Sequence, residues 1–283
     1  GLVKKAVFAN SCAEIADMML PEGIMNFTSV PALGLWLGAL MYMLQIYLDF
    51  SAYSDMAIGM GLMVGFHYKE NFNYPYISNT VTEFWRRWHI SLSSFFRDYV
   101  YIPLGGNRKG SRRTIINLFI VWALTGLWHG SSWNFVFWGL YYFIFLVLEK
   151  KVLLKKLEKL PGFIGHIYAM AVVYFGWIIF KFTDLSYLGH MLKGMFGLNH
   201  NGFVNLEVVM TFKNNIFFII VAVIACTPLA KELYKWMCRK CKTVVIFKYL
   251  RRIIEIAGPV LLLLVATMAL VGNSYNPFLY FQF

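Results

Sequence analysis

The chain has 283 residues, of which 59% are hydrophobic, 18% aromatic and only 14% charged. Soluble domains average about 25% charged residues, so this composition excludes an ordinary soluble or disordered chain. The net charge of +12 would suit a nucleic-acid partner, but 17 of the 26 Lys and Arg fall in three stretches between apolar runs, at 105–113, 149–160 and 231–252. Such clusters are typical of cytoplasmic loops of membrane proteins, so we expect membrane lipid and no nucleic acid around the chain.

Long apolar runs predict an all-α, polytopic transmembrane bundle forming a single domain over 1–283. In chain order the runs are residues 31–49, 56–66, 114–128, 131–148, 163–180, 214–230 and 255–272. With the basic stretches on the cytoplasmic side, 163–180 crosses outward, 214–230 returns and 255–272 crosses again, so the segment 181–213 and the C-terminus lie outside.

Two carboxylates, Asp49 and Asp55, stand at the end of the first run. Buried carboxylates beside an apolar span are candidates for a proton relay in a transporter. The alternative is a structural role, with Arg86, Arg87 or Arg97 as partners.

Residues 82–101 carry large apolar side chains at three- and four-residue spacing, interspersed with charges, which predicts one amphipathic helix. Thr80 or Thr82 is the expected N-cap. His89 lies within this helix, and from its neighbours alone a structural or interfacial role is favoured. The Pro- and Gly-containing run 102–110 ends the helix.

The loop 105–113 contains Arg108, Lys109, Arg112 and Arg113 and no acidic residue. Its simplest interpretation is a solvated basic loop. The sharper hypothesis is a dock for an anionic donor, such as the phosphates of coenzyme A or an acidic carrier protein, because Arg suits phosphate recognition.

The segment 114–148 has basic stretches on both flanks, so it is expected to enter the membrane and return to the same side. Its first arm of 15 residues is about 22 Å long as a helix, shorter than a hydrocarbon core of about 30 Å. The turn containing His129 is therefore expected within the membrane depth, lining a cavity. An imidazole there is either a general base or a buried histidine bonded to a carbonyl, and chemistry alone leaves both open.

Other motifs argue against metal and disulfide chemistry. Cys238 and Cys241 form an isolated C-x-x-C pair, interpreted as reduced thiols, because a zinc site needs two further ligands. No histidine has metal-ligand spacing, and there is no P-loop, dinucleotide-binding glycine pattern or G-x-S-x-G. We expect no metal and no tightly bound cofactor.

Several long runs carry distinctive motifs: Asp49–Asp55, Glu83–Leu92, Phe96–Arg108, Gly126–Gly130 with Trp133, and Asn276–Phe283. These runs resemble the membrane-bound O-acyltransferase (MBOAT) family, in particular its bacterial branch that modifies exported polymers. The run at residues 102–108 favours the alginate-type members over the D-alanyl-type members. Family members carry further transmembrane helices before the segment that matches Gly1, so an N-terminally incomplete chain is expected.

The resemblance implies a helical ring with a central tunnel, in which His129 is the catalytic histidine and His89 the second one. It also implies an acyl thioester donor such as acetyl-CoA, an exported polysaccharide acceptor, and a periplasmic or extracellular SGNH-type acetyltransferase as partner. The expected location is the inner or plasma membrane, crossed several times. The alternatives are D-alanyl transfer to a cell-wall polymer, a proton-coupled transporter, and a purely structural subunit of an export complex.

Overall fold

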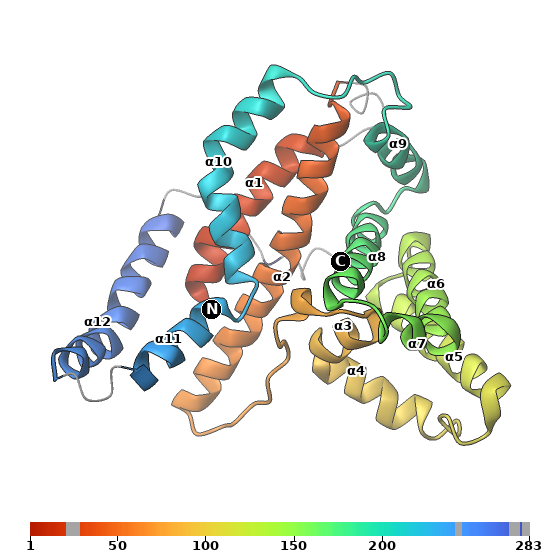
Figure 1. Cartoon of the computed structure of the whole chain (residues 1–283), viewed down its shortest axis with the longest axis horizontal. Coiled ribbons are helices and arrows are strands. Elements are labelled where there is room, and N and C mark those ends of the chain that lie inside the picture. The colour runs from red at the N-terminus through yellow and green to blue at the C-terminus, as the bar shows by residue number, and fades with distance from the viewer. Residues whose placement is uncertain (21–28, 241–244, 272–277, 279–283) are drawn as a thin grey trace. The chain divides into compact units, whose positions relative to one another are not determined.

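A computed structural model describes residues 1–20, 29–240, 245–271 and 278, and the ribbon is all helical over these residues, as expected (Figure 1). These residues form two compact units, which are described separately. The first comprises residues 1–15, 44–68 and the described part of 210–282. The second comprises residues 16–43 and 69–209. Two helices, α1 (Asn10–Met19) and α2 (Ala32–Met63), contribute to both.

The second unit contains the residues predicted for the site. Two short helices, a helical hairpin and two further helices make up most of it. In chain order these are α3 (Val81–Arg87), α4 (Ile90–Phe96), the π-helical segment η4 (Arg97–Tyr101), α5 (Gly110–His129), α6 (Trp133–Leu148), the π-helical segment η5 (Glu149–Leu153), α7 (Leu154–Leu157), α8 (Gly162–Lys181) and α9 (Leu185–Met195).

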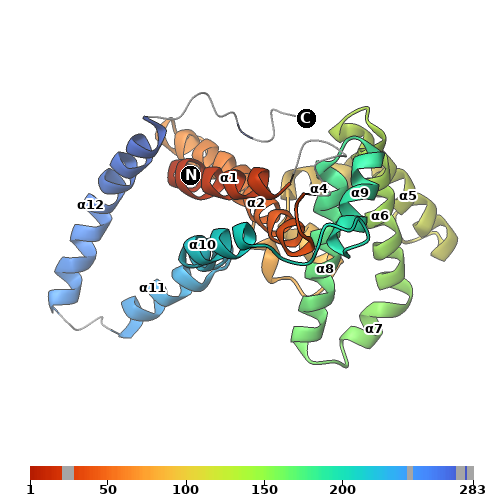
Figure 2. The ribbon, with the colours of Figure 1, turned by 90° about the horizontal axis from the view of Figure 1, so that it is seen from above.

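The hairpin predicted over 114–148 is present as α5 and α6, which lie side by side in both ribbon views (Figures 1 and 2). Glycines allow the two backbones to approach closely. A methyl group on Gly139 would overlap the carbonyl oxygen of Trp122, and one on Gly126 would overlap that of Phe135. Small residues at such crossings are typical of packed membrane helices. The α5 helix has 20 residues and not 15, because the polar turn Gly110–Arg113 and His129 are also helical.

An aromatic core fills the second unit where α3, α5, α6 and α8 meet. The Trp85 and Trp122 ring centroids are 4.8 Å apart, and those of Trp88 and Trp177 are 4.7 Å apart. Trp138 and Tyr142 from α6 complete the cluster with edge-to-face contacts. Each of these side chains is at least nine-tenths buried. Large rings buried in this way supply most of the contact that holds the short α3 in place.

The first unit contains η1 (Lys4–Ala9), most of α10 (Leu206–Ala225), α11 (Leu229–Lys240) and α12 (Val245–Leu270). Its buried carboxylate, Asp49, forms an ion pair of 2.8 Å with Lys5, and Asp55 forms one of 2.7 Å with Lys4. These ion pairs favour the structural alternative for both carboxylates, with lysines as partners in place of the expected arginines. Nothing in the sequence indicated that Lys4 and Lys5, more than 40 residues away in the chain, would be the partners of these carboxylates.

Within the described residues, four helices are long and apolar enough to cross a membrane: Ala32–Met63, Gly162–Lys181, Leu206–Ala225 and Arg251–Leu270. The expected separate runs 31–49 and 56–66 are one helix, because no residue between them breaks a helix and both carboxylates are neutralised by lysines. The expected run 214–230 begins earlier, at Leu206, and ends at Ala225, shortly before Pro228. Cys238 is a half-buried free thiol. Cys241, the C-terminus and all of the run Asn276–Phe283 except Phe278 lie outside the described residues.

The glycine contact between α5 and α6 generates the first prediction. Gly139→Ala should lower the free energy of unfolding by about 1–3 kcal/mol, because the added methyl group meets a backbone carbonyl that cannot move away easily. Thermal unfolding of the detergent-purified protein measures the change. Gly189→Ala on α9 is the matched control, since no atom lies within 4 Å of its added methyl group. Equal unfolding temperatures for both variants would contradict the close helix contact.

Candidate active site

The predicted amphipathic helix 82–101 is interrupted at the point where His89 lies. The α3 helix ends at Arg87, Trp88 is extended (φ −101°, ψ 130°), and His89 adopts a left-handed conformation (φ 43°, ψ 58°) before α4 begins at Ile90. The expectation of one continuous helix was therefore wrong. A positive φ at a non-glycine residue costs about 1–3 kcal/mol and persists only where the surrounding structure holds it.

The interruption is held by residues 71–73, which run beside it. Their backbone forms hydrogen bonds with groups that a continuous helix would have paired internally. Ile90 N–H donates to the Asn71 carbonyl, and Asn73 N–H donates to the Arg87 carbonyl, both at 2.9 Å. The Asn71 side chain also accepts from the backbone N–H of Ser91 at 3.0 Å. These backbone groups are therefore hydrogen-bonded although the helix is broken. In an apolar environment, leaving them unpaired would be energetically costly.

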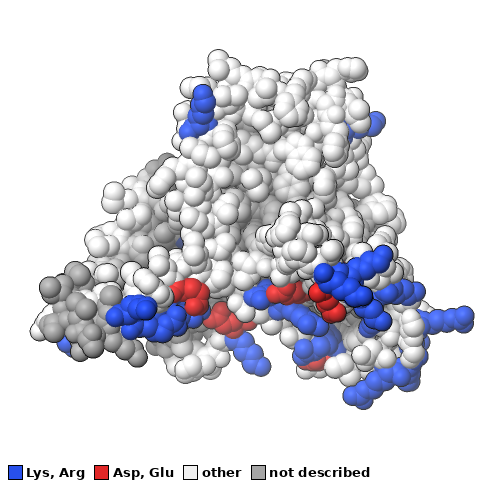
Figure 3. Space-filling view, viewed as in Figure 1, with Lys and Arg blue, Asp and Glu red and all other residues white. Residues whose placement is uncertain are grey.

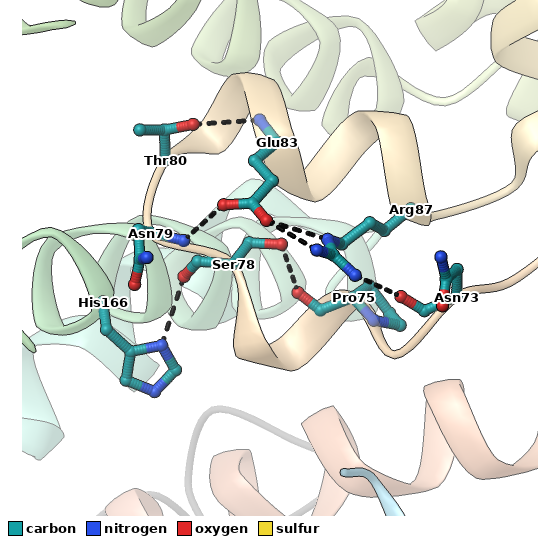
Figure 4. Close-up of polar contacts among 8 residues, drawn as sticks. All are labelled: Asn73, Pro75, Ser78, Asn79, Thr80, Glu83, Arg87 and His166. Carbon is teal, nitrogen blue, oxygen red and sulfur yellow. Dashed lines mark hydrogen bonds and ion pairs between the residues drawn. The ribbon is translucent and has the colours of Figure 1, made fainter. Parts of the chain in front are cut away.

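The start of α3 is held equally firmly, by the network shown in Figure 4. Of the two expected caps, Thr80 is the correct one, since its hydroxyl accepts from the Glu83 N–H at 3.0 Å. The Glu83 carboxylate accepts from the Asn79 N–H and pairs with Arg87 one turn later at 2.8 Å. His166 from α8 lies 3.1 Å from the carbonyl of Ser78, which anchors the preceding turn.

A residue that the sequence did not single out completes this cap. Glu149 lies in the basic stretch 149–160 but is completely buried, and its carboxylate reaches the N-terminus of α3. It accepts hydrogen bonds from the Val81 N–H (2.6 Å), the Thr82 N–H (2.8 Å) and the Thr82 hydroxyl (2.6 Å). A carboxylate at this end of a helix is favourable for both the free N–H groups and the helix dipole. The partners are 67 and 68 residues away, so no local pattern could have revealed them.

His129 is the last residue of α5, and Gly130 ends the helix with a φ of 152°. The imidazole packs edge-to-face against Trp138 and Phe180, with centroid distances of 4.9 and 5.2 Å. The side chain is only half-buried, and among the described residues no protein group forms a hydrogen bond with its ring nitrogens. The alternative of a buried histidine bonded to a carbonyl therefore finds no support in this part of the chain.

Trp128 connects the two histidines. Its ring lies edge-to-face against both imidazoles, with centroid distances of 4.9 Å to His129 and 5.9 Å to His89. His89 Nδ1 lies 3.3 Å from the Ser91 hydroxyl, so that nitrogen already has a partner on its own helix. Two imidazoles beside one half-exposed tryptophan ring form a site suited to proton transfer.

The four predicted donor-binding residues lie elsewhere. Arg108, Lys109, Arg112 and Arg113 are all exposed at the opposite end of α5, a helix about 30 Å long. Cations in a first helical turn oppose the helix dipole, so their position is not explained by stability. Figure 3 shows Lys and Arg side chains gathered on this end of the second unit. A cavity of about 450 Å³ beside the loop is lined by Asn107, Ser111, Lys150 and Lys151, among others, so η5 adds two lysines that the sequence did not assign to this region.

The buried cap generates the second prediction. Glu149→Ala should lower the free energy of unfolding by about 2–5 kcal/mol, because two buried N–H groups and a hydroxyl lose a charged acceptor. Hydrogen exchange should rise selectively in α3 and around His89. Glu149→Gln, which keeps one acceptor oxygen, should lie between. Glu158→Gln, an exposed neighbour, is the control, and an equally small effect of both variants would show that the cap is dispensable.

Comparison with known proteins is consistent with this arrangement. Residues 1–189 match the MBOAT, membrane-bound O-acyltransferase family. The chain is 46% identical to the probable alginate O-acetylase AlgI of Azotobacter vinelandii over 69% of its length, and 36% identical to that of Pseudomonas putida over all of it. It is 39% identical to the peptidoglycan O-acetyltransferase of Helicobacter pylori over 70% of its length. The chain spans 38%, 59% and 38% of these relatives, respectively. It is a multi-pass membrane protein that belongs to the membrane-bound O-acyltransferase family.

Proposed function

We propose that the two histidines form the centre of an O-acyltransferase site, with His129 as the general base. One observation carries the proposal, namely the accessibility of the His129 imidazole. His129 lies at the turn of the closely packed α5–α6 hairpin, and its side chain is half-exposed. None of the described protein groups forms a hydrogen bond with its ring nitrogens, so a substrate hydroxyl has access to them. A neutral imidazole takes up a proton near neutral pH, which suits this role.

The reaction proceeds in two steps. A ring nitrogen of His129 takes the proton of the acceptor hydroxyl while its oxygen attacks the carbonyl carbon of the acyl thioester. The tetrahedral intermediate then collapses, the carbon–sulfur bond breaks, and the thiol leaves with the proton that His129 held. His89 orients the acyl group or polarises its carbonyl. Its fixed backbone conformation suits that task, since positioning a reactant contributes strongly to rate.

The donor approaches from the basic end of α5. Arg108, Lys109, Arg112 and Arg113 attract the phosphates of an acyl thioester, which we take to be acetyl-CoA, and Lys150 and Lys151 add charge at the same end. The long separation along α5 then requires the thioester arm to reach inward from a phosphate group held at the loop. No tightly bound cofactor takes part.

The acceptor is a hydroxyl on the other side of the inner or plasma membrane. The relatives are named for alginate and peptidoglycan, so an exported polysaccharide is the final acceptor, with an SGNH-type acetyltransferase outside the membrane as the intermediate carrier. The sequence run at 102–108 favours acetyl transfer of the alginate type over D-alanyl transfer. A transporter is less well supported, because Asp49 and Asp55, its candidate proton relay, are paired with lysines.

His129→Gln tests the base. The substitution keeps hydrogen-bonding capacity and approximate size but removes the ability to accept a proton near pH 7. Acetyl transfer in membranes should fall by about 10²- to 10⁴-fold, with expression and unfolding temperature nearly unchanged. His190→Gln is the control, because His190 bonds the carbonyl of Ser186 on its own helix and should tolerate glutamine. Substantial transfer by a well-folded His129→Gln protein would overturn the assignment.

Replacing Arg108, Lys109, Arg112 and Arg113 together by Gln tests the donor side. The KM for the donor should rise by about tenfold with kcat little changed, because each exposed charge pair contributes less than about 1 kcal/mol. The KM of the unaltered protein should also rise with salt.

The control for this change replaces Lys155, Lys156 and Lys159, three lysines of the adjacent stretch, by Gln. An equal rise in KM would show that only net charge matters. A cysteine at position 109 that reacts exclusively with reagents added outside the cell would contradict the orientation itself.

A further inference from the structure

A second cavity, of about 650 Å³, lies between α3, α4 and η4 on one side and α5 on the other. Its volume falls within the range of about 300–1,000 Å³ that small-molecule sites occupy. Neither His129 nor His89 is among its lining residues, and the acyl-transfer chemistry assigned above makes no use of it.

The interior of the cavity is apolar. Leu92, Leu118, Val121 and Leu146 line it together with the rings of Trp85 and Trp122. Of the five hydroxyl-bearing residues that also line it, three are already engaged: Ser93 donates to the Trp85 carbonyl, Thr125 to the Val121 carbonyl and Thr82 to Glu149. Ser94 and Tyr101 are the other two. An alkyl chain is the kind of group that gains most from such a lining.

One cation at this cavity has no partner among the residues that the structure describes. Arg86 lines it and is exposed, and no ion pair or hydrogen bond to its side chain is found within the described ranges. The two other arginines nearby are occupied: Arg87 pairs with Glu83, and Arg97 pairs with Asp98 at 2.8 Å. Arg86 therefore offers an unused guanidinium beside an apolar chamber, which is the arrangement that binds an anionic amphiphile.

The wall formed by α4 and η4 points to the source of that amphiphile. Phe95, Tyr99 and Ile102 are more than half exposed on it, next to the charged pair Arg97 and Asp98. Exposed aromatic rings mixed with charges are typical of segments that lie at the headgroup level of a bilayer. A lipid reaches a cavity behind such a wall directly from the membrane.

We propose that this cavity binds an anionic phospholipid, with the phosphate on Arg86 and one acyl chain between α4 and α5. A phosphodiester with a single charge matches the single free guanidinium, whereas the several charges of a nucleotide donor match the basic loop at the start of α5. The bound lipid stabilises the two short helices that carry His89. The inference stands on the cavity and on Arg86, and it does not require the reaction proposed for the histidines.

The test uses delipidated, detergent-purified protein and dioleoyl phosphatidylglycerol, with dioleoyl phosphatidylcholine, which is zwitterionic and has no net charge, as the comparison. Native mass spectrometry counts bound lipids, and thermal unfolding reports stabilisation by the bound species. Phosphatidylglycerol should bind and raise the unfolding temperature more than phosphatidylcholine does. Arg86→Gln should weaken phosphatidylglycerol binding by roughly tenfold, and it should leave phosphatidylcholine nearly unaffected.

Two further variants separate the cavity from the surface. Val121→Phe fills the chamber and should weaken both lipids, whereas Leu124→Phe, on the exposed side of the same helix, should weaken neither. Lys159→Gln is the charge control for Arg86→Gln. Equal binding of the two lipids, or loss of binding in the control variants, would overturn the proposal. Competition between acetyl-CoA and phosphatidylglycerol that Arg86→Gln abolishes would assign the cavity to the donor and overturn it as well.

Discussion

The second unit depends on one buried carboxylate. The α3 helix has only seven residues, too few to be stable alone, yet it carries Trp85 of the aromatic core and leads directly to Trp88 and His89. Its first N–H groups have no partner within the helix and are shielded from water. Glu149 satisfies two of them from the far end of α6, and Thr80 satisfies a third. The position of the whole segment from residue 80 to residue 91 follows from this contact and from the strand-like run at 71–73.

Hydrogen bonds from outside the helix also explain why the chain can be broken at Trp88 and His89. An uninterrupted helix from residue 81 to residue 101 would satisfy its backbone internally but would present its side chains at fixed helical angles. The break at Trp88 and His89 redirects the chain so that Trp88 packs on Trp177 while His89 faces Trp128. Residues 71–73 supply the hydrogen bonds that the helix gives up. Non-helical backbone in an apolar setting needs such replacement hydrogen bonds, because each unpaired polar group there is costly.

Periodicity and charge were sufficient to predict the all-α fold, the hairpin over 114–148 and the long span at 163–180, because these depend on local composition. They did not predict the break at Trp88, the role of Glu149 or the lysine partners of Asp49 and Asp55. Each of these depends on a contact between residues far apart in the chain. Glu149 is instructive, since a carboxylate within a lysine-rich run looks like a solvated residue until α3 is placed against it. The pairing of the two histidines came from the family resemblance, and no spacing rule would have brought residues 89 and 129 to one tryptophan.

The left-handed conformation of His89 makes this position unlike most others in a mutational survey. Glycine adopts that conformation without steric strain, whereas the Cβ atom of alanine causes the same strain as that of histidine. An alanine at residue 89 thus removes the ring and keeps the backbone strain, while a glycine removes the ring and relieves the strain. A selection for stability alone would therefore enrich glycine at this position, and a selection for activity would remove it. Residue 89 is a site where the protein retains conformational energy that it could release by a single substitution.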